Sequence, residues 1–145
     1  MSAAHSAHPF PSGHVPRALV VDDEASIRRV LRRYLERAGW AVDDAGDGAM
    51  AEAQLFTSGA HYDLVICDLN LPDCTGLELR AAIEDRAPYL LERFVVATGE
   101  SADGSGPLSG AEAQELAGRG RLLAKPFSLE DLGALVRAIG PAVAA

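Results

Sequence analysis

The sequence predicts an α/β domain, in which helices cover both faces of a parallel sheet. Five short apolar runs alternate along the chain with five segments of helical periodicity. The run at 64–67 is apolar at every position, as expected for a central parallel strand that is covered on both sides. Because crossovers between parallel strands are right-handed, this alternation builds one sheet with a layer of helices on each face.

The first strand is predicted at 18–21, and Asp22 and Asp23 follow it directly. A helix is expected from Glu24 to Ala38, because its apolar residues recur at helical spacing, and Gly39 ends it. Five arginines lie off the apolar stripe of this helix, at positions 28, 29, 32, 33 and 37. They indicate either a solvated face or a docking surface for an acidic partner.

The second strand begins at 40–42, a polar turn follows at 43–48, and a second helix covers 49–58. The third strand, at 64–67, stops at Asp68, where the chain leaves the predicted core. Pro72 and Gly76 shape the turn that comes next, and a third helix covers 76–86.

A fourth strand at 93–97 ends in Thr98 and Gly99. The stretch 100–110 is rich in Gly and Ser and can bury little, and a weak helix at 111–117 follows it. A fifth strand at 121–124 ends in Lys125-Pro126. The last helix begins after Ser128, which resembles an N-cap, and Gly140-Pro141 ends it.

Size and charge narrow the class of protein. The 145 residues suit a single domain at 17–140, with a flexible N-terminal tail at 1–16 and a C-terminal tail at 141–145. The net charge of −8 argues against a nucleic-acid surface. We expect no membrane contact and a cytoplasmic location, because no apolar run reaches the roughly 18 residues of a membrane span and the N-terminus lacks a signal pattern. Cys67 and Cys74 lack a zinc-type partner pair, and we expect both to be reduced and structural.

The chemistry of the strand ends carries the functional prediction. Asp22 and Asp23 follow the first strand, Asp68 the third, Thr98 the fourth and Lys125 the fifth. Because the carboxyl ends of parallel strands meet at one edge of a sheet, these side chains should share a cleft. Three carboxylates there would repel one another, so a divalent cation and Lys125 are expected to offset them.

Mg²⁺ suits this set, because it prefers carboxylate and carbonyl oxygens and keeps several waters. Asp22 or Asp23, Asp68 and a loop carbonyl would supply the protein ligands. Asp68 can then act as a nucleophile that forms an aspartyl-phosphate, while Lys125 and Thr98 contact the phosphoryl oxygens. Any one of these residues alone would be read as an ordinary turn or cap.

The chain resembles the receiver domain of two-component response regulators over about residues 17–140. The residues that carry the resemblance are VVDDE at 20–24, DLNLP at 68–72 with Gly76, ATG at 97–99 and KPF at 125–127. The resemblance implies a flavodoxin-like, doubly wound sheet of five strands in the order 2-1-3-4-5, with five helices.

The resemblance also implies the roles of the site residues. Asp68 would be the phospho-acceptor, Thr98 and Lys125 would read the phosphoryl group, and the Lys125-Pro126 bond would be cis. Asp22, Asp23, Asp68 and the backbone carbonyl of Asn70 would hold Mg²⁺. A sensor histidine kinase or a histidine phosphotransfer protein would donate the phosphoryl group, and a downstream protein would receive the signal. The domain would accept and lose the phosphoryl group without acting as a conventional enzyme.

One position departs from the family pattern. Family members often carry Tyr or Phe three residues before the lysine, and this chain carries Leu122. Leucine has no ring to turn inward on activation, so the switch should be built differently. We expect phosphorylation to order the 100–110 stretch and the helix at 111–117, which hydrogen exchange would detect. Asn70 and Glu100 border the expected path of attacking water, and we expect them to shorten the life of the phosphoryl state.

Other interpretations remain at this stage. The chain could be a receiver domain from a hybrid histidine kinase, or a receiver that acts unphosphorylated as an interaction module. A haloacid-dehalogenase-like phosphatase also uses Asp, Thr and Lys around a metal, but its nucleophile opens a DxD motif early in the chain. A flavin or nucleotide module is disfavoured, because Asp-Asp-Glu at 22–24 would repel a phosphate. The sequence leaves open the cognate kinase, the output partner and whether the chain forms a homodimer.

Overall fold

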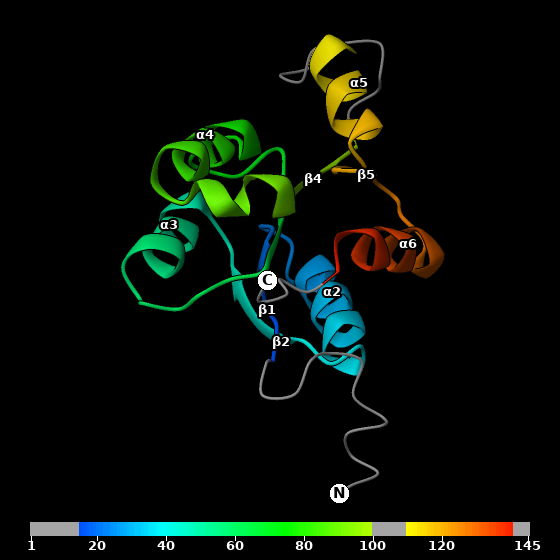
Figure 1. The fold of residues 1–145 in the computed structure, drawn as a ribbon, viewed down its shortest axis with the longest axis horizontal. Helices are drawn as coiled ribbons and strands as arrows, with labels where there is room; N and C mark the ends of the chain where they lie inside the picture. The colour runs from blue at the N-terminus through cyan, green and yellow to red at the C-terminus, as the bar shows by residue number, and fades with distance from the viewer. Residues whose placement is uncertain (1–14, 100–109, 141–145) are drawn as a thin grey trace, which may run out of the picture.

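The computed structural model describes residues 15–99 and 110–140, and these residues form one five-stranded sheet between two layers of helices (Figure 1). The strands are β1 (Arg17–Val21), β2 (Ala41–Ala45), β3 (Leu64–Asp68), β4 (Phe94–Thr98) and β5 (Leu122–Ala124). Their order is β2-β1-β3-β4-β5, and every neighbouring pair is parallel. The predicted fold class and strand order are therefore confirmed.

Helices cover the two faces of the sheet (Figure 1). They are α2 (Ala25–Arg37), α3 (Gly48–Phe56), α4 (Gly76–Arg86), α5 (Gly110–Gly118) and α6 (Leu129–Ile139). Buried residues of α2 and α6 pack on one face, and buried residues of α3, α4 and α5 pack on the other. None of the helices in the described part of the chain combines the length and apolar character that a membrane span requires.

Alternating side chains of the central strands supply both halves of the core. Ala18 and Val20 of β1 face α2 and α6, whereas Leu19 and Val21 face the opposite layer. The same alternation runs through Leu64–Cys67 of β3, all of which is buried. This double coverage explains why the strand has no polar position before Asp68, since each buried aliphatic side chain contributes about 1.5–3 kcal/mol.

The second strand is longer than predicted. It continues through Asp43 and Asp44 to Ala45, where the sequence analysis placed a polar turn. The two carboxylates are tolerated because β2 is an edge strand and both have partners. Asp43 accepts a hydrogen bond from the Tyr62 hydroxyl and pairs with Arg17, while Asp44 pairs with Arg28 and Arg32 of α2.

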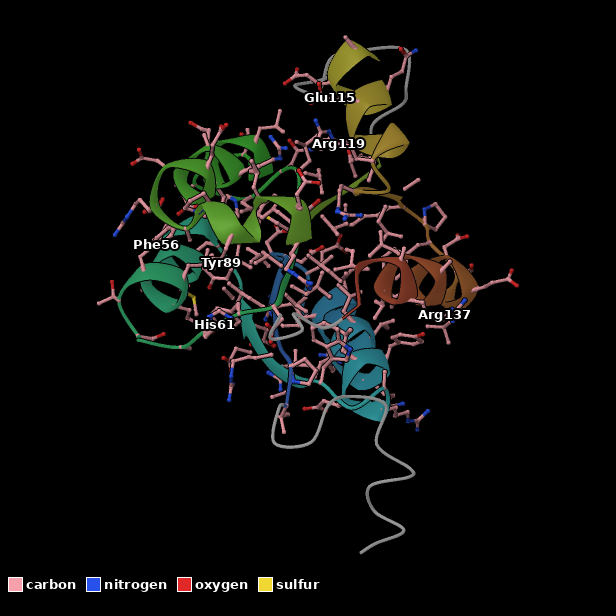
Figure 2. All side chains as sticks on the ribbon, viewed as in Figure 1. Phe56, His61, Tyr89, Glu115, Arg119 and Arg137 are labelled. Carbon is pink, nitrogen blue, oxygen red and sulfur yellow. The ribbon has the colours of Figure 1, made fainter. Side chains whose placement is uncertain are left out.

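A short 3-10 helix, η1 (Pro88–Arg93), lies between α4 and β4 and was not predicted. Pro88 starts it, and Leu90 is buried in the core. Tyr89 stacks on His61 with the ring centroids 4.9 Å apart, and both residues are labelled in Figure 2. In the sequence, η1 appears only as a proline followed by three large hydrophobic residues, a run that is too short to show a periodicity.

Other element bounds differ from the prediction by small shifts. The second helix runs over Gly48–Phe56 instead of 49–58, and the fourth strand over Phe94–Thr98 instead of 93–97. The predicted cap of the last helix is confirmed, because the Ser128 side chain accepts from the Asp131 N–H and Asp131 accepts from the Ser128 N–H. The predicted terminal tails and the 100–110 stretch fall almost wholly outside the described residues.

Candidate functional site

Strand register brings the predicted site residues to one edge of the sheet. Val21 of β1 pairs with Cys67 of β3, so Asp22 and Asp68 follow at adjacent strand ends. Asp68 itself pairs with Ala97 of β4, and Thr98 pairs with Ala124 of β5. The next residue of the chain is Lys125, whose backbone N–H donates to the Thr98 carbonyl at 2.8 Å. Residues far apart in the sequence thus meet because the sheet is parallel.

The three carboxylates form a cluster. One oxygen from each of Asp22, Asp23 and Asp68 lies within 4.8 Å of the other two. Asp22 is buried, Asp68 is half-buried and Asp23 is exposed, so the cluster is open to solvent on one side. Such a set of hard oxygen ligands, with room for water, fits Mg²⁺.

Local hydrogen bonds hold Asp22 in place. Its Oδ1 accepts from the Glu24 backbone N–H at 2.9 Å, which turns the carboxylate across the loop that precedes α2. Its backbone carbonyl accepts from Nη1 of Arg28 at 2.6 Å. Arg28 therefore fixes the backbone of the acidic loop from the first turn of α2, a role that the sequence analysis did not assign.

Lys125 lies between two of the carboxylates. Its Nζ is 2.8 Å from Oδ2 of Asp22 and 3.3 Å from Oδ1 of Asp68. The Lys125 side chain is 17 % exposed, so the ammonium is mostly withdrawn from water. The peptide bond that follows, Lys125-Pro126, is cis, as the resemblance implied.

Burial and the neighbouring charges shift the pKa values of both Asp68 and Lys125. Burial raises the pKa of Asp68 above its usual value; the Lys125 ammonium opposes this, and the Asp22 carboxylate adds to it. Burial by itself would lower the pKa of Lys125, but its hydrogen bond and attraction to Asp22, together with its attraction to Asp68, raise that pKa overall. Burial is thus the main reason that the pKa of Asp68 is raised, and a cation bound beside the carboxylate would favour its ionised form.

The loop after Asp68 is closed upon itself. Asn70 and Thr75 form an antiparallel bridge, and the Leu71 N–H donates to the Cys74 carbonyl at 3.0 Å. The Asn70 backbone N–H also hydrogen-bonds to the Asp68 carboxylate and lowers its pKa. The loop thus presents Asn70 close to the acidic cluster.

Gly76 lets the loop return under Asp68. A Cβ at this position would lie 2.7 Å from the Asp68 carbonyl oxygen, which is closer than real contacts allow. The Gly76 N–H donates to the Leu69 carbonyl at 2.7 Å. Thr75 and Glu78 then cap α4 reciprocally, which is a readable Thr-x-x-Glu signal that the sequence analysis missed.

Thr98 and Leu122 complete the described site region. Thr98 is buried at the end of β4. Leu122 begins β5, pairs with Val96 and packs partly buried against the core on the α3 and α4 side. Glu100, the predicted neighbour of the water path, lies outside the described residues.

A family model described as "Response regulator receiver domain" matches residues 18–137. Among curated proteins, the transcriptional regulatory protein ResD of Bacillus subtilis is 38 % identical over 125 residues. The alignment covers 85 % of this chain but 47 % of ResD, so the chain spans about half the length of the curated relatives it matches.

Solved structures show the same fold. The chemotaxis response regulator CheY4 of Vibrio cholerae has a TM-score of 0.67 at 31 % identity, covering 88 % of this chain and all 100 % of that one. The response regulator TrrA of Thermotoga maritima, solved in complex with Mg²⁺-BeF, has a TM-score of 0.67 at 30 % identity and covers 86 % and 99 % of the two chains.

Proposed function

Because the chain belongs to the response regulator receiver family, we propose that it accepts a phosphoryl group on Asp68 from a histidine kinase or a histidine phosphotransfer protein. Receiver domains are signalling domains and not conventional enzymes. The observation that carries the proposal is the position of Lys125 Nζ, which lies 2.8 Å from Asp22 and 3.3 Å from Asp68 beside a three-carboxylate cluster. The family match argues against the dehalogenase-like phosphatase interpretation.

In the proposed transfer, an oxygen of the Asp68 carboxylate forms a bond to phosphorus. The phosphorus–nitrogen bond to the donor histidine breaks, and the imidazole leaves with the electron pair. No general base is needed, because an ionised carboxylate is already a competent nucleophile. Hydrolysis of the aspartyl-phosphate later returns the carboxylate and inorganic phosphate.

Asp22, Asp23, Asp68 and the backbone carbonyl of Asn70 are proposed to hold Mg²⁺. When bound, the ion supplies positive charge that offsets the carboxylates and the incoming phosphoryl oxygens. The fit is supported by the cluster itself, in which one oxygen from each of the three carboxylates lies within 4.8 Å of the other two. TrrA, which was solved in complex with Mg²⁺-BeF, shares the fold.

Lys125 is proposed to transfer one of its contacts from a carboxylate to a phosphoryl oxygen, and Thr98 to donate a hydrogen bond to that oxygen. Thr98 is one residue beyond Ala97, the register partner of Asp68, and its carbonyl already binds the Lys125 backbone. A movement of Thr98 or Lys125 toward the phosphoryl group would therefore shift the ends of β4 and β5, which flank the chain between residues 99 and 121. Ordering of the 100–110 stretch and of the helix at 111–117 on phosphorylation stays a prediction, which hydrogen exchange would test.

The donor is proposed to dock on a groove between α2 and α6. Arg29, Arg33 and Arg37 are exposed and spaced four residues apart along α2, and they line this groove with Val30 and Leu129. Val30 is 45 % exposed and Leu129 59 % exposed, so the groove offers apolar contact beside positive charge. An acidic amphipathic helix matches that chemistry. The double substitution Arg29→Glu and Arg33→Glu should slow transfer from the donor protein while leaving phosphorylation by acetyl phosphate unchanged.

We propose that residues 17–140 act as the receiver unit and that the phosphorylated state changes a surface read by a downstream protein. The first described strand begins at Arg17, and the last described helix ends at Ile139, which fits that unit. A cytoplasmic location stays a prediction, and homodimer formation and membership of a longer hybrid kinase stay open alternatives.

Intact-mass measurement after incubation with acetyl phosphate and Mg²⁺ tests the chemistry directly. The protein should gain one phosphate-sized mass, and Asp68→Asn should lose that gain. Asp85→Asn is the matched control, because it makes the same acid-to-amide change on the exposed face of α4. Retention of the gain in Asp68→Asn, or its absence from the unaltered protein, would overturn the proposal.

A further inference from the structure

The carboxylate of Asp73 joins two elements that are distant in sequence. Its Oδ1 accepts from the Gly48 backbone N–H at 2.8 Å, and its Oδ2 accepts from the Ala49 N–H at 2.9 Å. These are the first two amides of α3, which have no partner within the helix. Asp73 itself lies at the tip of the loop that follows the acceptor Asp68. The acceptor loop thus caps a neighbouring helix.

The capping arrangement at α3 is shared between two acidic residues. Asp47, the residue before the helix, accepts from the third amide, that of Met50, at 2.8 Å. Asp73 covers the first two amides from outside the helix. Removing Asp47 would therefore weaken the helix start alone, whereas removing Asp73 would also release the loop.

Close packing at the same place makes the contact specific. A Cβ at Gly48 would collide with the Sγ of Cys74 and would lie 3.1 Å from Oδ1 of Asp73. The loop can approach α3 this closely only because position 48 is glycine. At its base the loop is closed by the Leu71–Cys74 hydrogen bond and by the Asn70–Thr75 bridge. A displacement of its tip is therefore transmitted to Asn70.

The contact favours a charged carboxylate. Hydrogen bonds from the Gly48 and Ala49 amides lower the pKa of Asp73, so it is ionised throughout the neutral range. An anion at a helix N-terminus also interacts favourably with the helix dipole. Asp73 thus remains a doubly bonded acceptor under all conditions in which the site would operate.

We propose that Asp73 is a positioning residue, which fixes the acceptor loop against α3 and so sets how well the loop carbonyl of Asn70 and the carboxylate of Asp68 bind a divalent cation. The inference rests on the proposed function of Asp68 and adds a second element, α3, to the machinery of the site. By thermodynamic reciprocity, cation binding must then protect the Gly48 and Ala49 amides to the same extent that the Asp73 contact strengthens cation binding. The state of the site is therefore sensed at α3, on the opposite side of the sheet from α2.

Three variants of the full chain test the proposal: Asp73→Ala, Asp73→Asn and Asp47→Ala. Mg²⁺ affinity is measured by calorimetric titration, and amide hydrogen exchange at positions 48 and 49 is measured with and without Mg²⁺. We expect Asp73→Ala to weaken Mg²⁺ binding about three- to tenfold, the range that corresponds to the loss of a helix cap. The Mg²⁺ affinity of Asp73→Asn should lie between those of the unaltered protein and Asp73→Ala, because the asparagine side chain retains one acceptor oxygen. Asp47→Ala should bind Mg²⁺ as the unaltered protein does.

In the unaltered protein, Mg²⁺ should slow exchange at Gly48 and Ala49. The proposal is overturned if Mg²⁺ leaves that exchange unchanged, if Asp73→Ala binds Mg²⁺ normally, or if Asp47→Ala loses as much affinity as Asp73→Ala. Failure of the proposed function looks different, because Asp68 in the unaltered protein would then gain no phosphate. A gain in mass together with normal Mg²⁺ affinity in Asp73→Ala would reject the inference alone.

Discussion

Replacing Lys125 by methionine tests the electrostatic balance of the site. With separations of 2.8 and 3.3 Å to Asp22 and Asp68, Coulomb's law at an effective dielectric constant of about 20 gives attractions of about 6 and 5 kcal/mol. The cost of withdrawing the three charges from water offsets most of this sum. Breaking a buried pair by removing one partner typically costs about 3 kcal/mol or more, which we take as the expected loss in the free energy of unfolding without Mg²⁺.

For a domain of this size, about 3 kcal/mol corresponds to a drop in melting temperature of about 10 °C. Because Mg²⁺ would bind the same carboxylates that the ammonium contacts, saturating Mg²⁺ should recover more than half of this loss. The Lys125→Met variant should also bind Mg²⁺ more tightly than the unaltered protein, since no ammonium competes for the oxygens, yet it should accept phosphate poorly.

The assay is thermal unfolding followed by circular dichroism, across a Mg²⁺ titration. Arg119→Met is the matched control, because it removes one positive charge from an exposed pair with Glu92, in which the charged atoms are 2.9 Å apart; Arg119 is labelled in Figure 2. That pair should contribute less than about 1 kcal/mol, independent of Mg²⁺. If Mg²⁺ stabilises Lys125→Met no more than it stabilises Arg119→Met, then Lys125 and the ion do not share carboxylates, and the reasoning fails.

Three further predictions follow from the site and the core. Without Mg²⁺, Asp68→Asn should raise the melting temperature. The pKa of Asp68 is higher in the folded state than in the unfolded state, so its ionisation lowers stability as the pH rises through that interval. The stabilisation by asparagine should therefore vanish at acid pH, where Asp68 is protonated in both states. Gly76→Ala should lose about 1–3 kcal/mol in chemical denaturation and should weaken Mg²⁺ binding, because its Cβ would press on the Asp68 carbonyl. Ile83→Ala, on the buried face of α4, should lose about 3–4 kcal/mol in chemical denaturation while Mg²⁺ affinity stays unchanged.

Much of the site could be predicted because it depends on backbone topology. Once the strands alternate with helices, parallel pairing alone brings Asp22, Asp68 and Lys125 to one edge. The contacts that hold these residues depend on tertiary approach and leave little trace in the sequence. Asp73 looks like an ordinary turn residue after Pro72, and its role becomes visible only when Gly48 is placed beside it.

The predicted extent of the second strand was wrong for a related reason. Asp43 and Asp44 are poor strand residues by propensity, and their partners Arg17, Tyr62 and Arg28 come from other elements. Local composition favours a turn, and tertiary ion pairs at a sheet edge override it. The 3-10 helix at Pro88–Arg93 was overlooked because six residues give no measurable period.

The bond between Lys125 and Asp22 spans 103 positions of the chain. During synthesis, the acidic residues leave the ribosome long before the lysine that faces them. A nascent or truncated polypeptide that ends before β5 therefore carries Asp22 and Asp68 without the Lys125 ammonium, and under the proposed function it should accept phosphate poorly even if its first strands have paired. The acidic cluster thus gains its ammonium only when the last βα unit has been synthesised and has folded onto the sheet.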